Sequence, residues 1–284
     1  MTPVLAWLEM RYGWRFIFQA TGAVGILWAL AWWLLYRDPD QARGVNAAEL
    51  RLIEEGGGIP ELSRKLEGTG SASLWRDLGF VLSKRKLWGL YLGQFGLLGT
   101  QWFFLTWFPT YLVQYRHMRL DKAGALASLP FMAAFLGVIL GGVLSDWLLR
   151  RGVSLTVARK IPVVGGLLLA STIVLANWCT DPRLVIACMT CSFFGCAFAS
   201  ITWSLVSTIA PERLIGLTGG MFNFISNCAA FVVPLVIGLL IHGNSFSRPL
   251  IFISAMGLMG VCSYVFLVGK IERISDSEPM SDRN

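Results

Sequence analysis

The sequence predicts an all-α integral membrane protein with about seven transmembrane helices. Only 14% of the 284 residues are charged, 55% are hydrophobic and the mean hydropathy is +0.61, whereas soluble domains have about 25% charged residues. The hydrophobic residues also form long runs that contain neither Lys nor Arg. Since a spanning helix needs about 20 largely apolar residues to cross roughly 30 Å of hydrocarbon, each run is long enough to span a bilayer.

The runs are separated by short polar connections, except for one long loop after the first run. Asp146, near the end of the third run, is the only acidic residue within them. The seven runs are residues 16–36, 88–114, 123–149, 161–180, 184–210, 215–241 and 250–269.

The basic residues of the connections predict the orientation of the chain. If the runs alternate across the bilayer, 17 of the 24 Lys and Arg residues fall on the side of the loop at 37–87 and seven on the other. Because Lys and Arg are enriched in cytoplasmic loops, we expect this loop and the C-terminus in the cytoplasm and Met1 outside. The expected location is the cell (inner) membrane, crossed several times.

Two other classes of protein fit the composition less well. The net charge of +7 could suggest a nucleic-acid partner, but that function needs basic residues gathered on one face of a soluble domain. The six cysteines, which include Cys188-x-x-Cys191, lie in or beside apolar runs and lack the further Cys or His ligands of a zinc site. We therefore expect no nucleic acid, no metal and no cofactor, and interpret these cysteines as small packing residues.

The loop at 37–87 contains two candidate short helices. Asn46 followed by Glu49 resembles a capping box that opens a helix through Glu55. A second amphipathic stretch begins at Ser73 and leads to the basic residues at 84–86. Such a helix can lie along the cytoplasmic surface with its cations near anionic lipid.

Small residues predict close contacts between the spanning helices. Gly137-x-x-x-Gly141 and Gly216-x-x-x-Gly220 are the clearest pairs, and such spacing lets helix backbones approach closely in lipid. We interpret both pairs as static packing seams.

Asp146 is expected to need cationic partners. Its carboxylate lies at the end of a helix, where the macrodipole is negative and an acid is unfavourable. We predict a charge cluster that holds the cytoplasmic side closed in one state and breaks in another. A solvated helix end would explain the basic residues, but not the acid among glycines. The predicted cluster is Asp146, Arg150, Arg151, Arg159 and Lys160.

These motifs resemble a known family. Gly142-x-x-x-Asp146 with its trailing basic residues is similar to the signature loop of the major facilitator superfamily. Gly13-Trp14-Arg15, Arg37-Asp38-Pro39, the segment 104–109 and the segment 219–223 are similar to its anion:cation symporter branch, the sugar-acid carriers of hexuronate, galactonate and glucarate type. The resemblance covers essentially the whole chain.

The resemblance implies a twelve-helix fold of two six-helix halves, from which this chain lacks roughly the first five helices. Residues 1–36 would then be an external segment and the sixth transmembrane helix, and 37–87 the cytoplasmic central linker with its short amphipathic helices. Residues 88–270 would be the C-terminal six-helix half, and 271–284 a cytoplasmic tail.

The resemblance also implies the substrate-binding positions, which are Gln94, Ser200, Thr202, Trp203 and Asn223. Neutral amides, hydroxyls and an indole N–H in apolar helices are groups that can hydrogen-bond a polyol. They can equally join helices to one another, as such residues often do in membranes. Gln101, Asn177 and Asn227 are further polar residues without a matched role.

The function implied by the resemblance is secondary transport, namely proton-coupled uptake of a sugar acid such as a hexonate, hexuronate or aldarate by alternating access. A proton-coupled carrier needs an ionisable group inside the membrane, and no Asp, Glu or His lies deep in the seven runs. The expected partners are therefore a small organic anion, a coupling proton, the lipid bilayer and a missing N-terminal half. The sequence leaves open which sugar acid is carried and whether H⁺ or Na⁺ is the coupling ion. It also leaves open the oligomeric state and the origin of the truncation.

Three alternatives remain. A seven-helix receptor has the same number of spans, although its long basic loop would not be expected after the first one. An integral membrane enzyme would need catalytic acids, a metal cluster or a nucleophile with its base, and Asp146 alone does not make such a site. A non-transporting paralogue that only binds its ligand fits the same residues. We expect no enzymatic activity.

Overall fold

The structure is a computed structural model that describes residues 8, 11–37, 42, 44–55, 71–118, 120–241, 243 and 245–274. It divides into two compact units, Met1–Thr69 and Gly70–Asn284. Residues 275–284 of the predicted tail at 271–284 lie outside the described residues.

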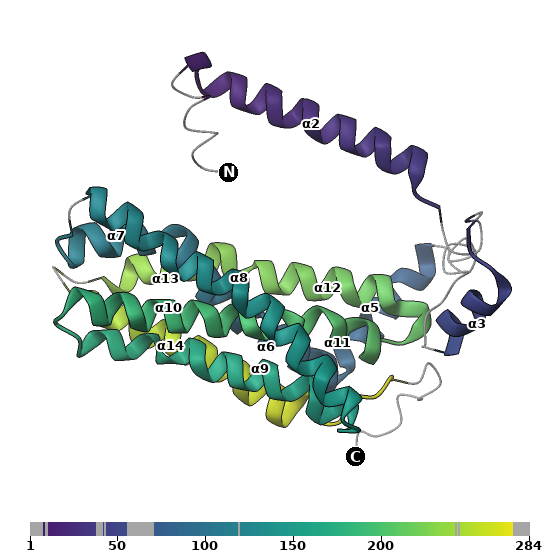
Figure 1. The fold of residues 1–284 in the computed structure, drawn as a ribbon. Helices are drawn as coiled ribbons and strands as arrows, with labels where there is room; N and C mark the ends of the chain where they lie inside the picture. The colour runs from purple at the N-terminus through teal and green to yellow at the C-terminus, as the bar shows by residue number, and fades with distance from the viewer. Residues whose placement is uncertain are drawn as a thin grey trace. The chain divides into compact units, whose positions relative to one another are not determined.

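Among the residues that the structure describes, the first unit contains α2 (Trp14–Leu35) and α3 (Ala47–Glu55) (Figure 1). Gly13 precedes α2 with φ of 80°, a left-handed conformation that suits glycine. The predicted cap of α3 is confirmed, because the backbone N–H of Glu49 donates to Asn46 Oδ1 at 2.9 Å.

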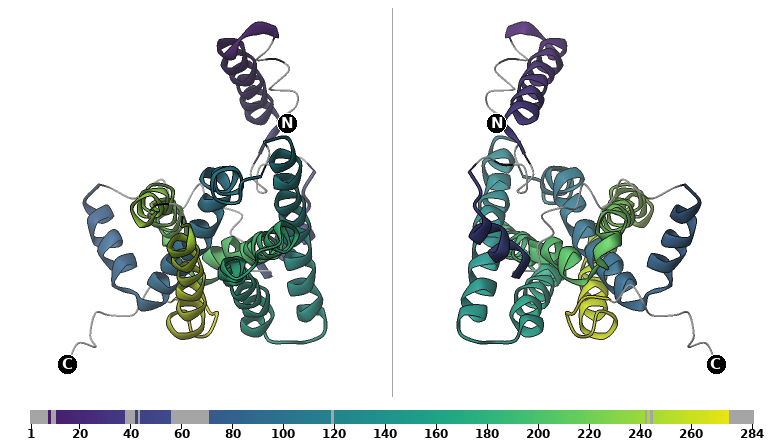
Figure 2. Two further views of the ribbon diagram at one scale, coloured as in Figure 1. Left: turned by 90° about the vertical axis from the view of Figure 1, so that its left-hand side faces the viewer. Right: turned by 90° about the vertical axis from the view of Figure 1, so that its right-hand side faces the viewer.

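The second unit is a bundle of long helices that pack side by side, as the views along their length show (Figure 2). It opens with α5 (Ser71–Ser83), α6 (Arg85–Thr106), the short α7 (Phe108–Thr110) and a π-turn, η1 (Tyr111–Tyr115). The remaining elements are α8 (Leu120–Arg150), α9 (Leu155–Ser171), η2 (Thr172–Asn177), α10 (Pro182–Phe198), η3 (Ala199–Ile201), α11 (Thr202–Ile209), η4 (Glu212–Leu214), α12 (Ile215–Asn227), α13 (Ala229–Leu240), α14 (Ser247–Cys262) and η5 (Ser263–Leu267).

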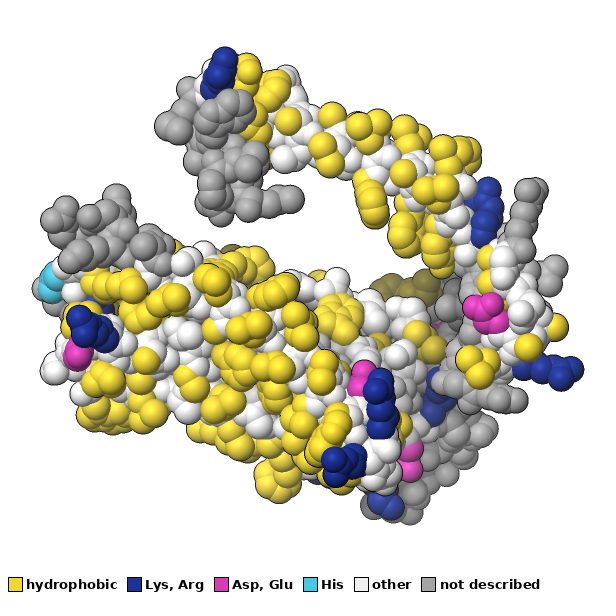
Figure 3. Space-filling model, in the orientation of Figure 1, with side chains coloured by type: hydrophobic (Ala, Val, Ile, Leu, Met, Phe, Trp, Pro, Cys, Tyr) yellow, Lys and Arg dark blue, Asp and Glu magenta, His cyan; other side chains and the backbone are white. Residues whose placement is uncertain are grey.

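The prediction of an all-α membrane protein is confirmed. Among the described residues, six segments are long and apolar enough to cross a bilayer, so the chain is a multi-pass membrane protein. They are Trp14–Leu35, Ser128–Arg150, Leu155–Asn177, Pro182–Ile209, Glu212–Leu240 and Ser247–Leu267. The basic side chains on the face drawn in Figure 3 gather mainly at the end of the bundle where α8 ends and α9 begins.

The run predicted at 88–114 is not among these six segments, and it contains α6, which is long enough to span but less apolar than the others. Twelve of its 22 residues are buried, so lipid does not set its composition. Glycines give the neighbouring helix room, since a Cβ on Gly96 would collide with the carbonyl oxygen of Met256 in α14. Gly96 and the other buried glycines of α6, with Gln94 and Thr100, lower its mean hydropathy. Such residues can occur in α6 because it lies in the interior of the bundle rather than against lipid.

Two of the spans are broken near their middle. The span at 182–209 changes from α10 to the 3₁₀ turn η3 before α11, and the span at 212–240 is interrupted at Cys228 between α12 and α13. Broken helices free backbone groups inside the membrane, which is tolerated where protein or a cavity surrounds them.

The two predicted glycine seams differ. A Cβ on Gly137 would lie 2.6 Å from the carbonyl oxygen of Phe194, and one on Gly141 would collide with that of Phe198, so this pair does join α8 to α10. A Cβ on Gly216 or Gly220 would meet nothing within 4 Å among the described residues. The second pair is therefore not a packing seam within this bundle.

A short segment after α14 connects several helix ends. Gly269, with φ of 60°, turns the chain, and the backbone N–H of Ile271 then donates to Thr156 Oγ1 of α9 at 3.0 Å. The backbone N–H of Ile274 donates to the carbonyl of Ile209 at the end of α11, also at 3.0 Å. Ion pairs of the same segment, Lys86 with Glu272 at 3.5 Å and Arg273 with Glu212, add α6 and η4 to these contacts.

Candidate functional site

Three helices bring polar side chains to a similar depth in the bundle. Gln94 lies nine residues from the start of α6, Thr202 seven from the end of α11, and Asn223 eleven from the start of η4. At 1.5 Å per residue these positions are about 10 to 16 Å from the same end of the bundle. Since the hydrocarbon is roughly 30 Å thick, they lie near the middle of the membrane, and Thr202 follows one of the helix breaks directly.

Gln94 and Thr202 hydrogen-bond to each other within the core. Thr202 Oγ1 donates to Gln94 Oε1 at 2.6 Å, and the two residues are only 0 and 2% exposed. Because a buried amide or hydroxyl without a partner is costly, this bond fixes the start of α11 against α6. The structure therefore brings these two predicted site residues together and buries them.

The other predicted residues lie on an open face of α11 and α12. Trp203 is 53% exposed and packs edge-on against Phe222, at a ring distance of 4.9 Å. Asn223, the next residue along α12, is exposed, while Ser200 is half-buried. An indole and an amide are thus both exposed outside the packed core.

Asn227, one turn further along α12, hydrogen-bonds to Asn223. Its Nδ2 donates to Asn223 Oδ1 at 2.7 Å and to the Asn223 carbonyl oxygen at 2.9 Å. With its side-chain oxygen accepting this bond, Asn223 is left with its NH₂ group to offer to a ligand. Sequence reasoning found Asn227 but gave it no role, although the i, i+4 spacing of two asparagines places them on one face.

The predicted charge cluster contains one ion pair among the described residues. Asp146 Oδ1 and Arg159 Nη1 are 3.6 Å apart, and Arg159 Nη1 also lies 3.3 Å from the hydroxyl of Ser145, which is fully buried. The pair links the end of α8 to α9. Because the Asp146 side chain is 59% exposed, such a pair contributes about 0–1 kcal/mol and is easily broken.

The remaining cations of the predicted cluster do not contact Asp146. The Arg151 guanidinium lies over the Trp147 ring at 4.5 Å, Arg150 is exposed and Lys160 is half-buried. Of the predicted cluster, the structure thus joins only Asp146 and Arg159.

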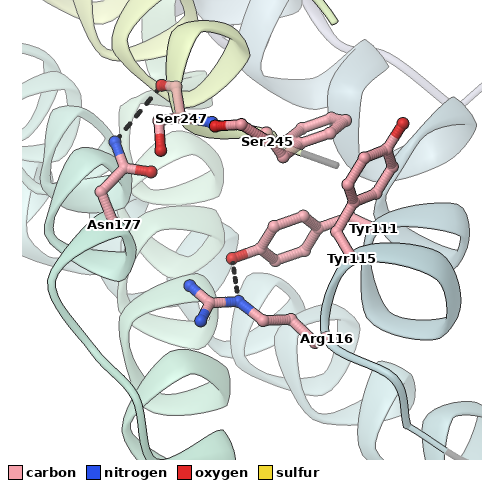
Figure 4. Close-up of a pocket in the computed structure, with 7 residues that line it drawn as sticks. Tyr111, Tyr115, Arg116, Asn177, Ser245 and Ser247 are labelled. Atoms are coloured by element: carbon pink, nitrogen blue, oxygen red, sulfur yellow. Dashed lines mark hydrogen bonds between the residues drawn. The ribbon is translucent and has the colours of Figure 1, made fainter. Parts of the chain in front are cut away.

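Sequence reasoning missed a small polar pocket at the opposite end of the bundle (Figure 4). Its volume is about 200 Å³, and Arg116 lies on one wall with Asn177 and Ser247 opposite. Arg116 donates to Tyr111 Oη at 2.7 Å, to the Cys179 carbonyl at 2.9 Å and to the Ala176 carbonyl. A cation at these carbonyls stabilises the C-terminal end of η2. The sequence signal for this pocket is Arg116, which lies two residues after the apolar run at 88–114.

The chemistry of the open face is hydrogen bonding without charge. It offers an indole N–H, amide groups and hydroxyls, which suit hydroxyl groups of a ligand. No cluster of three or more His, Cys, Asp or Glu residues that could hold a metal occurs in the part of the chain that the structure describes.

Comparison with known proteins gives consistent matches. The model of the Major Facilitator Superfamily matches residues 1–234. The chain is 44% identical to the D-galactonate transporter of Escherichia coli O6:H1 over 274 residues, which cover 96% of this chain and 64% of the relative. It is 41% identical to the probable galactarate/D-glucarate transporter GarP of Escherichia coli K12, and 38% identical to GudP of Bacillus subtilis, a protein of the same description; these matches cover 96% of this chain and 62% and 60% of the relatives.

The chain thus spans about three fifths of the length of these curated relatives. The family model covers most of the chain, and the identities extend along nearly all of it. The chain therefore belongs to the Major Facilitator Superfamily.

Proposed function

We propose that this chain is part of a secondary transporter that takes up a sugar acid by alternating access. The observation that carries the proposal is the open face of Trp203 and Asn223, which offers neutral hydrogen-bonding groups near the middle of the membrane. The names of the relatives, which are galactonate and galactarate/glucarate transporters, support an organic anion as substrate and a carrier rather than an enzyme.

In this proposal Trp203 and Asn223 contact the hydroxyl groups of the substrate, with Ser200 beside them. Gln94 and Thr202 hold the broken helix in place through their mutual bond. They reach the substrate only in a state in which that bond opens. The side chains of this face carry no charge, so they suit the hydroxyl groups of a sugar acid rather than its carboxylate.

The carboxylate of the substrate and the coupling proton need other residues. The described spans contain two acids, Asp146 near the end of α8 and Glu212 at the first residue of its span. Both lie near the ends of their spans, whereas proton coupling requires an ionisable group deep in the membrane. The proposal therefore assigns the proton-carrying acids and the carboxylate-binding cations to an N-terminal half of the complete carrier. Residues 88–270 are its C-terminal half and 37–87 its linker.

The Asp146–Arg159 pair serves as a gate in this proposal. It lies at the end of the bundle that carries most of the basic residues, which the positive-inside bias assigns to the cytoplasm. The inner membrane and a cytoplasmic C-terminus are part of the same proposal. An exposed, weak pair suits a contact that must break in every transport cycle.

The experiment is uptake by proteoliposomes that contain the full-length gene product. Labelled galactonate, glucarate and glucuronate are offered with and without an inward proton gradient. We expect proton-dependent uptake of at least one of them, and a loss of at least tenfold in kcat/KM for Trp203→Ala and Asn223→Ala. Absence of uptake for all three compounds would contradict the proposal, and uptake driven by a Na⁺ gradient alone would overturn its coupling ion.

A further inference from the structure

An apolar groove runs along the outside of the bundle between α8 and α10, away from the open face of α11 and α12. We propose that this groove binds one phospholipid with a zwitterionic ethanolamine headgroup. Its phosphate lies at Arg183 and one acyl chain lies between the two helices. The proposal does not depend on the transported substrate.

The groove is a cavity of about 660 Å³. Apart from Arg183, Thr190 and Cys191, its walls are apolar. The principal lining residues are Leu129, Met132 and Leu136 of α8 and Ile186, Ala187 and Phe194 of α10. A cavity of this kind takes a hydrocarbon chain more readily than a polar ligand, because burying apolar surface is its main source of affinity.

The groove lies on the exposed side of the helix pair, away from α6, and we place this side toward the bilayer. Phe193 of α10 stacks on Phe104 of α6 at 4.3 Å and meets Phe131 of α8 at 5.1 Å, so these rings close the inner side of the helix pair. On the groove side, Met132 and Leu136 are 65 and 54% exposed. Figure 3 shows this face over α8 and α10 with many hydrophobic side chains and no charged ones between the two ends of the bundle.

The length of the groove matches one leaflet. Arg183 is the second residue of α10, and Phe194 lies eleven residues further along the helix. At 1.5 Å per residue the groove extends about 16 Å from Arg183, which is half of the roughly 30 Å hydrocarbon thickness. A chain that starts at a headgroup beside Arg183 would therefore end near the bilayer centre.

Arg183 lines the groove, and Asp181 precedes it by two residues at the same end of α10. The Asp181 side chain caps α10 by accepting from the backbone N–H of Arg183 at 2.8 Å, so a carboxylate lies at the helix end from which the exposed Arg183 side chain projects. The Arg183 guanidinium makes no hydrogen bond or ion pair with any residue that the structure describes.

This pair of charges selects the headgroup. A guanidinium binds phosphate with two parallel hydrogen bonds, and a primary ammonium next to the phosphate can donate to Asp181. The choline group has no N–H to donate, and the headgroup of phosphatidylglycerol has no cation for the carboxylate.

The test uses the purified chain in detergent micelles with phosphatidylethanolamine that carries a photoreactive diazirine in its acyl chain. Native mass spectrometry counts the retained lipid, and peptide mapping locates the cross-links. We expect one tightly held lipid per chain, cross-linked to α8 and α10 within the groove. Arg183→Gln should lower the retained lipid about tenfold.

Arg248→Gln is the matched control, because Arg248 is also the exposed second residue of a helix, α14, but does not line the groove. Ala187→Trp fills the groove and should displace the chain, whereas Leu184→Trp, at an exposed position beside it, should not. All four positions are exposed, so the variants are expected to fold, which their thermal unfolding checks.

Equal retention by the Arg183 and Arg248 variants would overturn the proposal. Cross-links spread evenly over the apolar surface, or protein–protein cross-links from the groove to a second copy, would also overturn it. Phosphatidylglycerol or phosphatidylcholine held as tightly as phosphatidylethanolamine would contradict the assigned headgroup. Each of these results is independent of whether the protein transports sugar acids.

Discussion

Two asparagines on one face of α12 determine which group is offered to a ligand. Asn227 donates to the side-chain oxygen of Asn223, and we predict that Asn223 therefore meets the ligand mainly as a hydrogen-bond donor through its NH₂ group. Asn227→Ala should free the Asn223 amide to rotate and raise KM about three- to tenfold in uptake by the full-length protein, with little change in kcat.

Asn227→Asp gives the stronger test of the same bond. A carboxylate can only accept, so the Asn223 NH₂ group would turn toward it and present oxygen to the ligand. We expect a higher KM for Asn227→Asp than for Asn227→Ala. Equal KM values in the wild type and both variants, with Asn223→Ala still impaired, would contradict this orientation.

A second residue-scale prediction concerns the buried carboxylate of α5. Arg213 donates to both carboxylate oxygens of Asp77, at 2.6 and 3.2 Å, and Asp77 is only 5% exposed. Arg213→Leu would leave this acid buried without its bidentate partner. That should lower the free energy of unfolding by about 2–4 kcal/mol, measured as a loss of thermal stability in detergent.

The double variant Asp77→Leu/Arg213→Leu separates the ion pair from the packing. Because the uncompensated charge is then gone, we expect it to recover most of the lost stability. Arg150→Leu is the control at an exposed cation and should change stability by less than about 0.5 kcal/mol.

At the scale of elements, adjacent glycines in α8 provide a matched pair. Gly141 packs against the backbone of Phe198 in α10, whereas a Cβ on Gly142 would meet nothing within 4 Å. Gly141→Leu should force α8 and α10 apart and lower the free energy of unfolding by at least about 2 kcal/mol. Gly142→Leu should leave thermal stability nearly unchanged, and equal losses in the two variants would contradict the packing described for this helix pair.

A feature of a helix can be predicted from the sequence when it depends only on the residues of that helix, and not when it depends on how the helix packs against others. Runs without Lys and Arg identify the spans, because exclusion of charge from lipid acts on every residue of a run. The rotation of each helix about its axis is not local. Gln94 was therefore predicted to face the substrate but lies against Thr202, and two identical glycine motifs, at 137–141 and 216–220, have different surroundings.

The sequence indicated which polar residues could form a candidate site, but not the contacts that these residues make. The neutral polar groups were identified from the sequence. Trp203 and Asn223 are exposed, and their contact with a ligand stays a prediction. The partnership of Asn227 and the position of Arg183 at the mouth of a groove depend on helix packing. A single sequence does not contain that information in a form that spacing rules can recover.

At the scale of the whole molecule, the orientation in the membrane is testable with single cysteines. Ser245→Cys and Lys270→Cys, each in a background without the six native cysteines, lie near opposite ends of the bundle and are exposed. We expect a membrane-impermeant maleimide to label the first in intact cells and the second only after permeabilisation. The reverse pattern would overturn the assignment of the basic end to the cytoplasm.

The segment at 270–274 has a mechanical consequence for the second unit. It is hydrogen-bonded through its backbone to α9 and to the end of α11, and its ion pairs reach α6 and η4. Helix ends that share one tether cannot splay apart individually. We therefore expect the ends of α6, α9, α11 and η4 to move together when this end of the bundle opens, while the end of α8 stays free to separate from them.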